Sequence, residues 1–188
     1  MKTKTALALT ILPLTLAALA CTIFVGGPAY PTTPVAVSTE AVGNLGDQIN
    51  AAKTAAVDSG MLTLAMNESQ VTSLLAAKLA EQTDPLITEP QVYLRDGTIQ
   101  VYGKAVQGNL QANIRIVLSA SVDADGKPLI TATSADFGPL PAPDGLIHAI
   151  NSLVGEAFTG AIGPAATGFR LESINIADGV MTLTGRIK

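Results

Sequence analysis

The chain is poor in cysteine, tryptophan and aromatic side chains. It has one Cys, at position 21, and no Trp, and aromatic residues make up 4% of its 188 residues. Beyond position 21 there is therefore no disulfide framework, cysteine nucleophile or thiolate metal site. Scarce aromatics disfavour stacking platforms for sugars or nucleobases. The net charge of −4 also disfavours a nucleic-acid partner, because such a partner requires a basic surface.

Recognisable catalytic and metal-binding motifs are missing as well. His148 is the single histidine, and its place on the polar side of a predicted helix favours a solvated side chain without a nucleophile to activate. Residues 123–126 (Asp-Ala-Asp-Gly) resemble the start of a calcium loop, but the later ligands are absent, so we expect a plain turn. No phosphate-binding glycine loop or nucleophile elbow is present. The sequence therefore predicts a protein that is not an enzyme and needs no metal or cofactor.

Apolar residues are concentrated near the N-terminus. Lys2 and Lys4 precede an apolar run over residues 6–27, which as a helix of roughly 33 Å would cross a bilayer. Three interpretations stay open: a retained anchor, a lipoprotein signal with lipidation at Cys21, or a signal peptide that is removed. All three predict that the rest of the chain lies on the extracytoplasmic side of a cell membrane.

The chain after this run divides into a tether and one domain. Residues 28–39 begin with a proline-rich stretch, which favours an extended tether. Residues 40–188 are predicted to form a single α+β domain with its core in residues 60–188. Helical spacing of apolar residues predicts helices over residues 40–59, 67–83 and 144–162. Strands are predicted over residues 61–64, 92–104, 109–123, 129–137 and 174–186.

Local signals mark the start of one helix and the turns of two hairpins. Asn67 and Gln70 have the spacing of a capping box at the start of the second helix. Asp96-Gly97 and Asp178-Gly179 are each flanked by alternating apolar residues, which is the pattern of a tight β-hairpin. The two hairpins match at every apolar, glycine and basic position, 82 residues apart. Internal duplication and independent selection of the same turn both explain this match.

The longest alternation of apolar and polar residues covers residues 109–123. At ~3.3 Å per residue this strand would span roughly 50 Å, whereas a usual strand has about 5–6 residues. Such a strand must curl around apolar material. The expected fold is therefore α+β, a long curved antiparallel β-sheet with amphipathic helices packed on its apolar face.

Small residues on the inward side of this sheet suggest space for a ligand. Ala112 and Ala120 on the long strand, with Gly103 and Ala105 on its neighbour, would leave room beneath the helices. An acyl chain would suit such a cleft, at ~0.8 kcal/mol per buried CH₂. The candidate lipid-binding residues are Leu74, Leu75, Leu79, Val101, Ala112, Ile114, Ile116, Leu118, Ile150, Leu153 and Phe158. The alternatives are a scaffold or protein-interaction module with a closed core, and an accessory lid for an envelope enzyme.

Residues 62–75 (Leu-Thr-Leu-Ala-Met-Asn-Glu-Ser-Gln-Val-Thr-Ser-Leu-Leu) and the two Asp-Gly hairpins resemble parts of known families. They are similar to membrane-tethered bacterial envelope proteins of the YpmS-like, LmeA-like and YceB-like type. The last of these is related to tubular lipid-binding (TULIP) modules, which wrap a curved sheet around a long helix. The resemblance covers residues 60–188. It implies a protein of the bacterial cell membrane that binds or passes lipid or another hydrophobic small molecule without turning it over, and it implies no catalytic residue.

Overall fold

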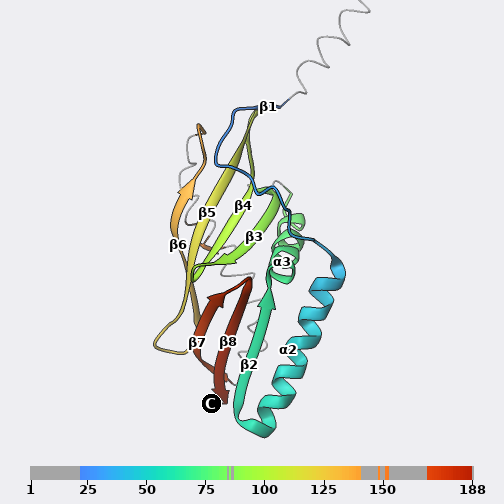
Figure 1. Cartoon of the computed structure of the whole chain (residues 1–188), viewed down its shortest axis with the longest axis vertical. Helices are drawn as coiled ribbons and strands as arrows, with labels where there is room; N and C mark the ends of the chain where they lie inside the picture. The colour runs from blue at the N-terminus through green and yellow to red at the C-terminus, as the bar shows by residue number, and fades with distance from the viewer. Residues whose placement is uncertain are drawn as a thin grey trace, which may run out of the picture.

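The computed structural model describes residues 22–83, 85, 87–140, 148, 151–152 and 169–187. In this part of the chain, two helices and eight strands form an elongated body of the α+β class, as expected (Figure 1). The helices are α2 (Thr39–Ser59) and α3 (Glu68–Ala80). The strands are β1 (Ile23–Phe24), β2 (Met61–Asn67), β3 (Thr88–Arg95), β4 (Thr98–Gln107), β5 (Leu110–Val122), β6 (Pro128–Asp136), β7 (Phe169–Ala177) and β8 (Val180–Ile187).

The two predicted Asp-Gly hairpins are confirmed as β3–β4 and β7–β8. Both central residues of each turn have positive φ: 52° and 72° at Asp96 and Gly97, and 51° and 79° at Asp178 and Gly179. A type I′ turn requires this conformation at both positions, and its twist matches that of the flanking strands. Local turn chemistry therefore accounts for both hairpins.

The long strand β5 organises the larger sheet. Its even-numbered residues from Ala112 to Leu118 are buried and its odd-numbered residues are more exposed, as the alternation predicted. Strand β4 pairs antiparallel along one edge of β5, and β6 pairs antiparallel along the other edge. Strand β1 extends the β6 side by pairing in parallel with Leu110 and Gln111.

Hydrogen bonding divides the strands into two sheets, where the sequence predicted one. The larger has the order β1-β5-β4-β3, with β6 also on β5, and the smaller has the order β2-β8-β7. The two are placed along the long axis of the molecule and meet through backbone hydrogen bonds (Figure 1). The amide of Gly179 donates to Leu94 O at 3.1 Å, and the amide of Leu171 donates to Gly126 O at 3.0 Å. The matching hairpins thus lie in different sheets.

Each described helix has clear end signals and covers one sheet. Ser38 caps α2, whose last turn ends at Gly60 in the left-handed conformation. The predicted capping box of Asn67 and Gln70 is present at the start of α3, which ends three residues before the predicted boundary. Helix α2 packs on β2, and α3 packs on β3 (Figure 1). The predicted helix over residues 144–162 lies largely outside the described residues.

The described residues begin at Thr22, so Cys21 and most of the predicted anchor lie outside them. From Thr22 onward, no described helix combines the length and the hydropathy that a membrane crossing requires. Ile23 and Phe24, which the sequence assigned to the anchor, instead belong to the sheet as β1. Their strand conformation fits the β-branched and aromatic composition of residues 22–25.

Candidate ligand-binding face

The inward surface of β4 and β5 contains five of the predicted lipid-binding residues. Val101, Ala112, Ile114, Ile116 and Leu118 are all buried, and we call this set the apolar face. In the antiparallel register Val101 lies opposite Ile116, so their side chains leave the same side of the sheet. The structure therefore brings these residues together as the sequence predicted. Burial alone is compatible with a packed core and with a ligand-lined surface.

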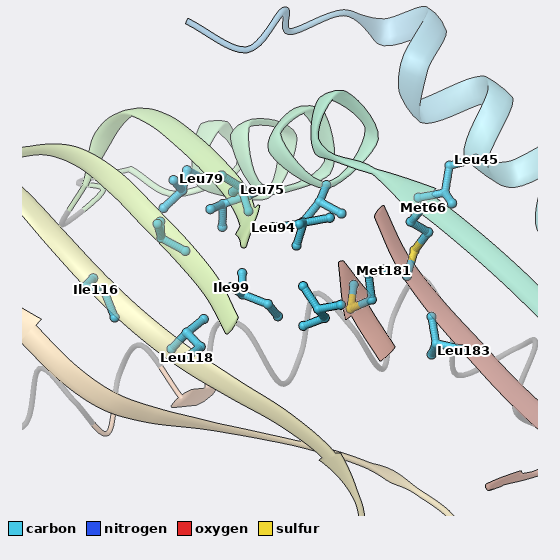
Figure 2. Close-up of a cluster of buried hydrophobic side chains, with 14 of the residues drawn as sticks. Leu45, Met66, Leu75, Leu79, Leu94, Ile99, Ile116, Leu118, Met181 and Leu183 are labelled. Atoms are coloured by element: carbon cyan, nitrogen blue, oxygen red, sulfur yellow. The ribbon is translucent and has the colours of Figure 1, made fainter. Parts of the chain in front are cut away.

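Helix α3 supplies three further predicted residues. Leu75 and Leu79 are buried, whereas Leu74 is half-buried at the margin of the core. In the close-up, Leu75 and Leu79 lie on the side of α3 that faces the strands carrying Ile99, Ile116 and Leu118 (Figure 2). The remaining predicted residues, Ile150, Leu153 and Phe158, lie outside the described residues, so their place in the site stays a prediction.

The small residues of the apolar face differ in how much space they leave. A Cβ added to Gly103 would lie 2.3 Å from the Ile87 Cγ2 methyl, so Ile87 already fills the space beside this glycine. Gly103 therefore does not contribute the room that the sequence predicted. Ala105 and Ala112 face each other across β4 and β5, and Ala112 has no exposed surface. Ala120 is half-buried and pairs with Ile130 of β6. The three alanines are thus the small-residue positions that remain for the ligand hypothesis.

The hydrophobic core continues without a break from one sheet to the other. Met66 on β2 and Met181 on β8 lie opposite each other in register and are both buried. They lie between Leu45 of α2 and the residues Leu94 and Ile99 near the first hairpin tip (Figure 2). Methionine is flexible and polarizable, so it fills irregular spaces of this kind. One apolar cluster thus runs through both halves of the elongated body.

The outer side of the junction between the sheets is polar. The Glu68 carboxylate accepts a hydrogen bond from the amide of Leu94 at 2.8 Å and forms an ion pair with Arg95. The guanidinium of Arg95 also lies 5.9 Å from the ring centre of Tyr93. These groups border a shallow hollow of about 560 Å³ that also includes the Asp178-Gly179 turn. The hollow exposes no apolar-face residue, so it belongs to a different surface.

All three tyrosines of the chain gather on this outer surface, an arrangement that no local sequence pattern predicted. Residues 28–36, which we call the strap, lie along β3 there, held by hydrogen bonds from the Tyr93 hydroxyl to Thr33 O and from the Tyr30 hydroxyl to Glu89 O. Burial, with a smaller contribution from the charge of Glu89, raises the pKa of Tyr30 to about 12. Burial and then Glu68 raise the pKa of Tyr93. The segment predicted as a tether is therefore bound to the domain along this stretch.

The other chemical candidates have structural explanations. His148 is exposed, as predicted. Asp123 accepts hydrogen bonds from the amides of Asp125 and Lys127 through its Oδ1, so residues 123–127 form the expected turn. Within the described part of the chain, no group of three or more His, Cys, Asp or Glu side chains is placed to hold a metal ion.

Comparisons with known proteins give a weak structural similarity. No protein-family model matches the chain, and no curated protein matches its sequence. A solved structure described as "Crystal structure of lipopolysaccharide binding protein" aligns with 69% of this chain at 11% identity and a TM-score of 0.28. The alignment covers 49% of that protein, so this chain spans about half of its length.

Proposed function

We propose that this chain is a membrane-associated bacterial protein, with its domain on the extracytoplasmic side, that binds a lipid or other hydrophobic molecule on the apolar face and does not transform it. The observation that carries the proposal is the single apolar cluster that runs through both sheets of an elongated body. An acyl chain is long and apolar, so it suits a cluster that extends through both sheets. Each CH₂ transferred from water into it contributes ~0.8 kcal/mol.

Membrane association is proposed from the sequence of the N-terminus. The apolar run of residues 6–27 follows Lys2 and Lys4, the arrangement of an anchor or signal with its positive end in the cytoplasm. In the alternative interpretation the chain is cleaved before Cys21, and lipidation of this cysteine replaces the anchor as the membrane attachment. With a retained anchor or a lipidated Cys21, the domain stays close to a source of hydrophobic ligand.

The Ala112→Val variant tests the binding site directly. Two added methyl groups at this buried strand position would occupy the space proposed for the ligand, so binding of a fluorescent fatty acid should weaken while thermal stability without ligand changes little. If neighbouring side chains already fill the space beside Ala112, the same change should lower the free energy of unfolding by about 1–3 kcal/mol. In that case the unchanged chain should not bind the probe either.

A matched control is Ala56→Val, at another alanine with no exposed surface, on α2 beside the smaller sheet. Its valine is expected to leave probe binding unchanged, although the added methyl groups at this buried helix position should lower the free energy of unfolding by about 1–3 kcal/mol. Equal loss of binding in both variants would show that the apolar face is not the site.

A scaffold without ligand is the second candidate, and the filled space at Gly103 favours it. Ile87 occupies the space that a side chain at position 103 would enter, so this glycine allows close packing. If Ala105 and Ala112 are packed in the same way, the cluster is a closed core and the chain acts through its surface. The fatty-acid assay on the unchanged chain distinguishes the two candidates.

A further inference from the structure

The end of the molecule formed by β1, the end of β4 and the start of β5 exposes an unusual set of apolar side chains. Ile23 is 59% exposed, Phe24 55%, Val106 49% and Leu110 40%. We call these four residues the β1 tip. Register places them together, because Ile23 is paired with Leu110, and both Phe24 and Val106 are paired with Gln111. The tip is thus one continuous apolar end of the larger sheet.

Apolar residues occupy both surfaces of the sheet at this tip. Residues paired across neighbouring strands share a side of the sheet, so Ile23 and Leu110 lie on the side of the buried Ala112. Phe24 and Val106 lie on the opposite side, where β5 carries Asn113 and Arg115 farther along. Elsewhere in β5 that side is polar apart from Val117. A flat docking partner would cover one side only, whereas an apolar medium that surrounds the tip would contact both.

The tip carries no charge and continues directly from the apolar N-terminal run. Residues 22–27 and 105–111 contain no acidic or basic side chain, and the closest sequence charge on β4, Lys104, is paired with Glu89 at 2.7 Å. Backbone hydrogen bonds from Ile23 N to Asn109 O at 2.7 Å and from Val25 N to Gln111 O at 2.8 Å fix the run to β5. The residues that would enter a bilayer therefore lead into the sheet at this tip.

The opposite end of the molecule offers a useful contrast. Val57, Met61 and Ile187 are also exposed there, at the turn between α2 and β2 (Figure 1). That end contains charged neighbours, since Asp58 follows Val57 and Met61 pairs with Arg186. Apolar exposure is thus common to both ends, whereas absence of charge and continuity with the apolar run belong to the β1 tip.

We propose that the β1 tip inserts into the outer leaflet of the membrane, so that the larger sheet stands on the bilayer and the α2–β2 turn points away from it. The occupant is the interfacial layer of a lipid bilayer, because exposed apolar area without basic residues favours hydrophobic insertion over attraction to anionic headgroups. The polar Gln107 and Asn109 at the same end limit the insertion to a shallow depth. This inference rests on the membrane association proposed above, and it does not depend on a bound ligand.

The experiment uses the natural absence of tryptophan, which makes any introduced Trp the only one. Val106→Trp and the matched control Val57→Trp are each made in the full chain and reconstituted into phosphatidylcholine vesicles with and without bromine on the acyl chains. Bromine quenches Trp that contacts the acyl region. Val106 is remote in sequence from the apolar run, so quenching there reports insertion of the folded tip and not only of the anchor.

We expect brominated lipid to quench the Trp emission of Val106→Trp and to leave that of Val57→Trp unchanged. Bromine placed near the headgroup end of the acyl chain should quench Val106→Trp more strongly than bromine near the chain end. Leu110→Trp is a second reporter if Val106→Trp does not fold, as judged by circular dichroism. Equal emission of the tip reporter in both kinds of vesicle would overturn the inference, as would equal quenching of both variants or a tip covered by a second copy of the chain.

Flotation of the unchanged chain with the same vesicles separates this inference from the proposed function. A chain that stays with the vesicles while its tip reporter is not quenched is membrane-associated without tip insertion. A chain that does not float contradicts membrane association itself, and with it the insertion.

Discussion

The hairpins β3–β4 and β7–β8 have the same turn and the same pattern, yet they lie in different surroundings. Both turn at Asp-Gly with positive φ at the two central residues. The first hairpin continues into the long strand β5 and is covered on its outer side by the strap. The second is flanked by β2 on one edge. The comparison teaches that local sequence determines each hairpin, whereas distant segments determine what it contacts.

The equivalent glycines of the two hairpins show this difference most sharply. An added Cβ at Gly103 would meet the Ile87 Cγ2 methyl at 2.3 Å, whereas at Gly185 it would meet the backbone oxygen of Arg170 at 2.7 Å. The Ile87 methyl belongs to a stiff β-branched side chain, but Ile87 precedes β3 in a connecting segment that can shift, whereas a paired strand backbone cannot shift without disrupting its ladder. Gly185→Ala is therefore expected to lower the free energy of unfolding by about 3 kcal/mol and Gly103→Ala by about 1 kcal/mol.

Urea unfolding of both glycine variants measures this comparison. A larger loss for Gly103→Ala than for Gly185→Ala would show that the Ile87 contact is the more rigid of the two. The contrast between the hairpins would then be reversed.

The charged groups beside the hairpins provide the second comparison. Glu68 accepts a hydrogen bond from the amide of Leu94 and pairs with Arg95, and 17% of its side chain is exposed. Removing this acceptor leaves a largely buried amide unpaired, so Glu68→Ala should cost about 1–3 kcal/mol of unfolding free energy. Glu172→Ala is the matched control in the second hairpin. Its ion pair with Arg186 is mostly exposed and should contribute at most about 1 kcal/mol.

Chemical denaturation at neutral pH, repeated at high salt, compares these two variants. The Glu68→Ala loss should persist in salt because it arises mainly from an unpaired amide. Similar small losses for both variants would mean that the Glu68 contact stabilises the first hairpin no more than a surface ion pair.

The strap gives the smallest expected effect, a loss of stability at high pH. Burial raises the pKa of Tyr30 to about 12 in the folded protein, against 10.0 for an unperturbed tyrosine. Between these values the unfolded chain releases the proton first, so the stabilising contribution is complete below pH 10 and declines as the pH rises toward 12. The Tyr30 phenolate also cannot donate its hydrogen bond to Glu89 O.

Thermal unfolding of the unchanged chain and of Tyr30→Phe across this range isolates the tyrosine. The difference in midpoint between the two should change as the pH rises from 10 to 12. A constant difference would show that Tyr30 ionises alike in the folded and unfolded chains.

Features set by neighbouring residues were predictable from the sequence, and features set by distant segments were not. The Asp-Gly turns, the capping box at Asn67 and the alternation of β5 depend on a few adjacent residues, and all three are confirmed. The parallel pairing of β1 with β5 joins residues far apart in the chain.

The candidate site follows the same division. Alternation correctly identified the inward residues Ala112 to Leu118, because a strand alternates its side chains between two sides. It could not show that Ile87 fills the space at Gly103, or that Tyr30, Tyr93 and Tyr102 gather on the outer surface. Both facts depend on where a connecting segment packs against the sheet. No local sequence pattern predicts that position.

The most direct test of a ligand on the apolar face is a pair of mass measurements on the full chain purified from membranes. Under native conditions the account predicts a mass above that of the denatured chain by the mass of a hydrophobic molecule, which organic solvent extracts. A covalent lipid at Cys21 would remain in the denatured measurement and so be distinguished from bound ligand. Equal native and denatured masses, together with no binding of a fluorescent fatty acid, would contradict the account.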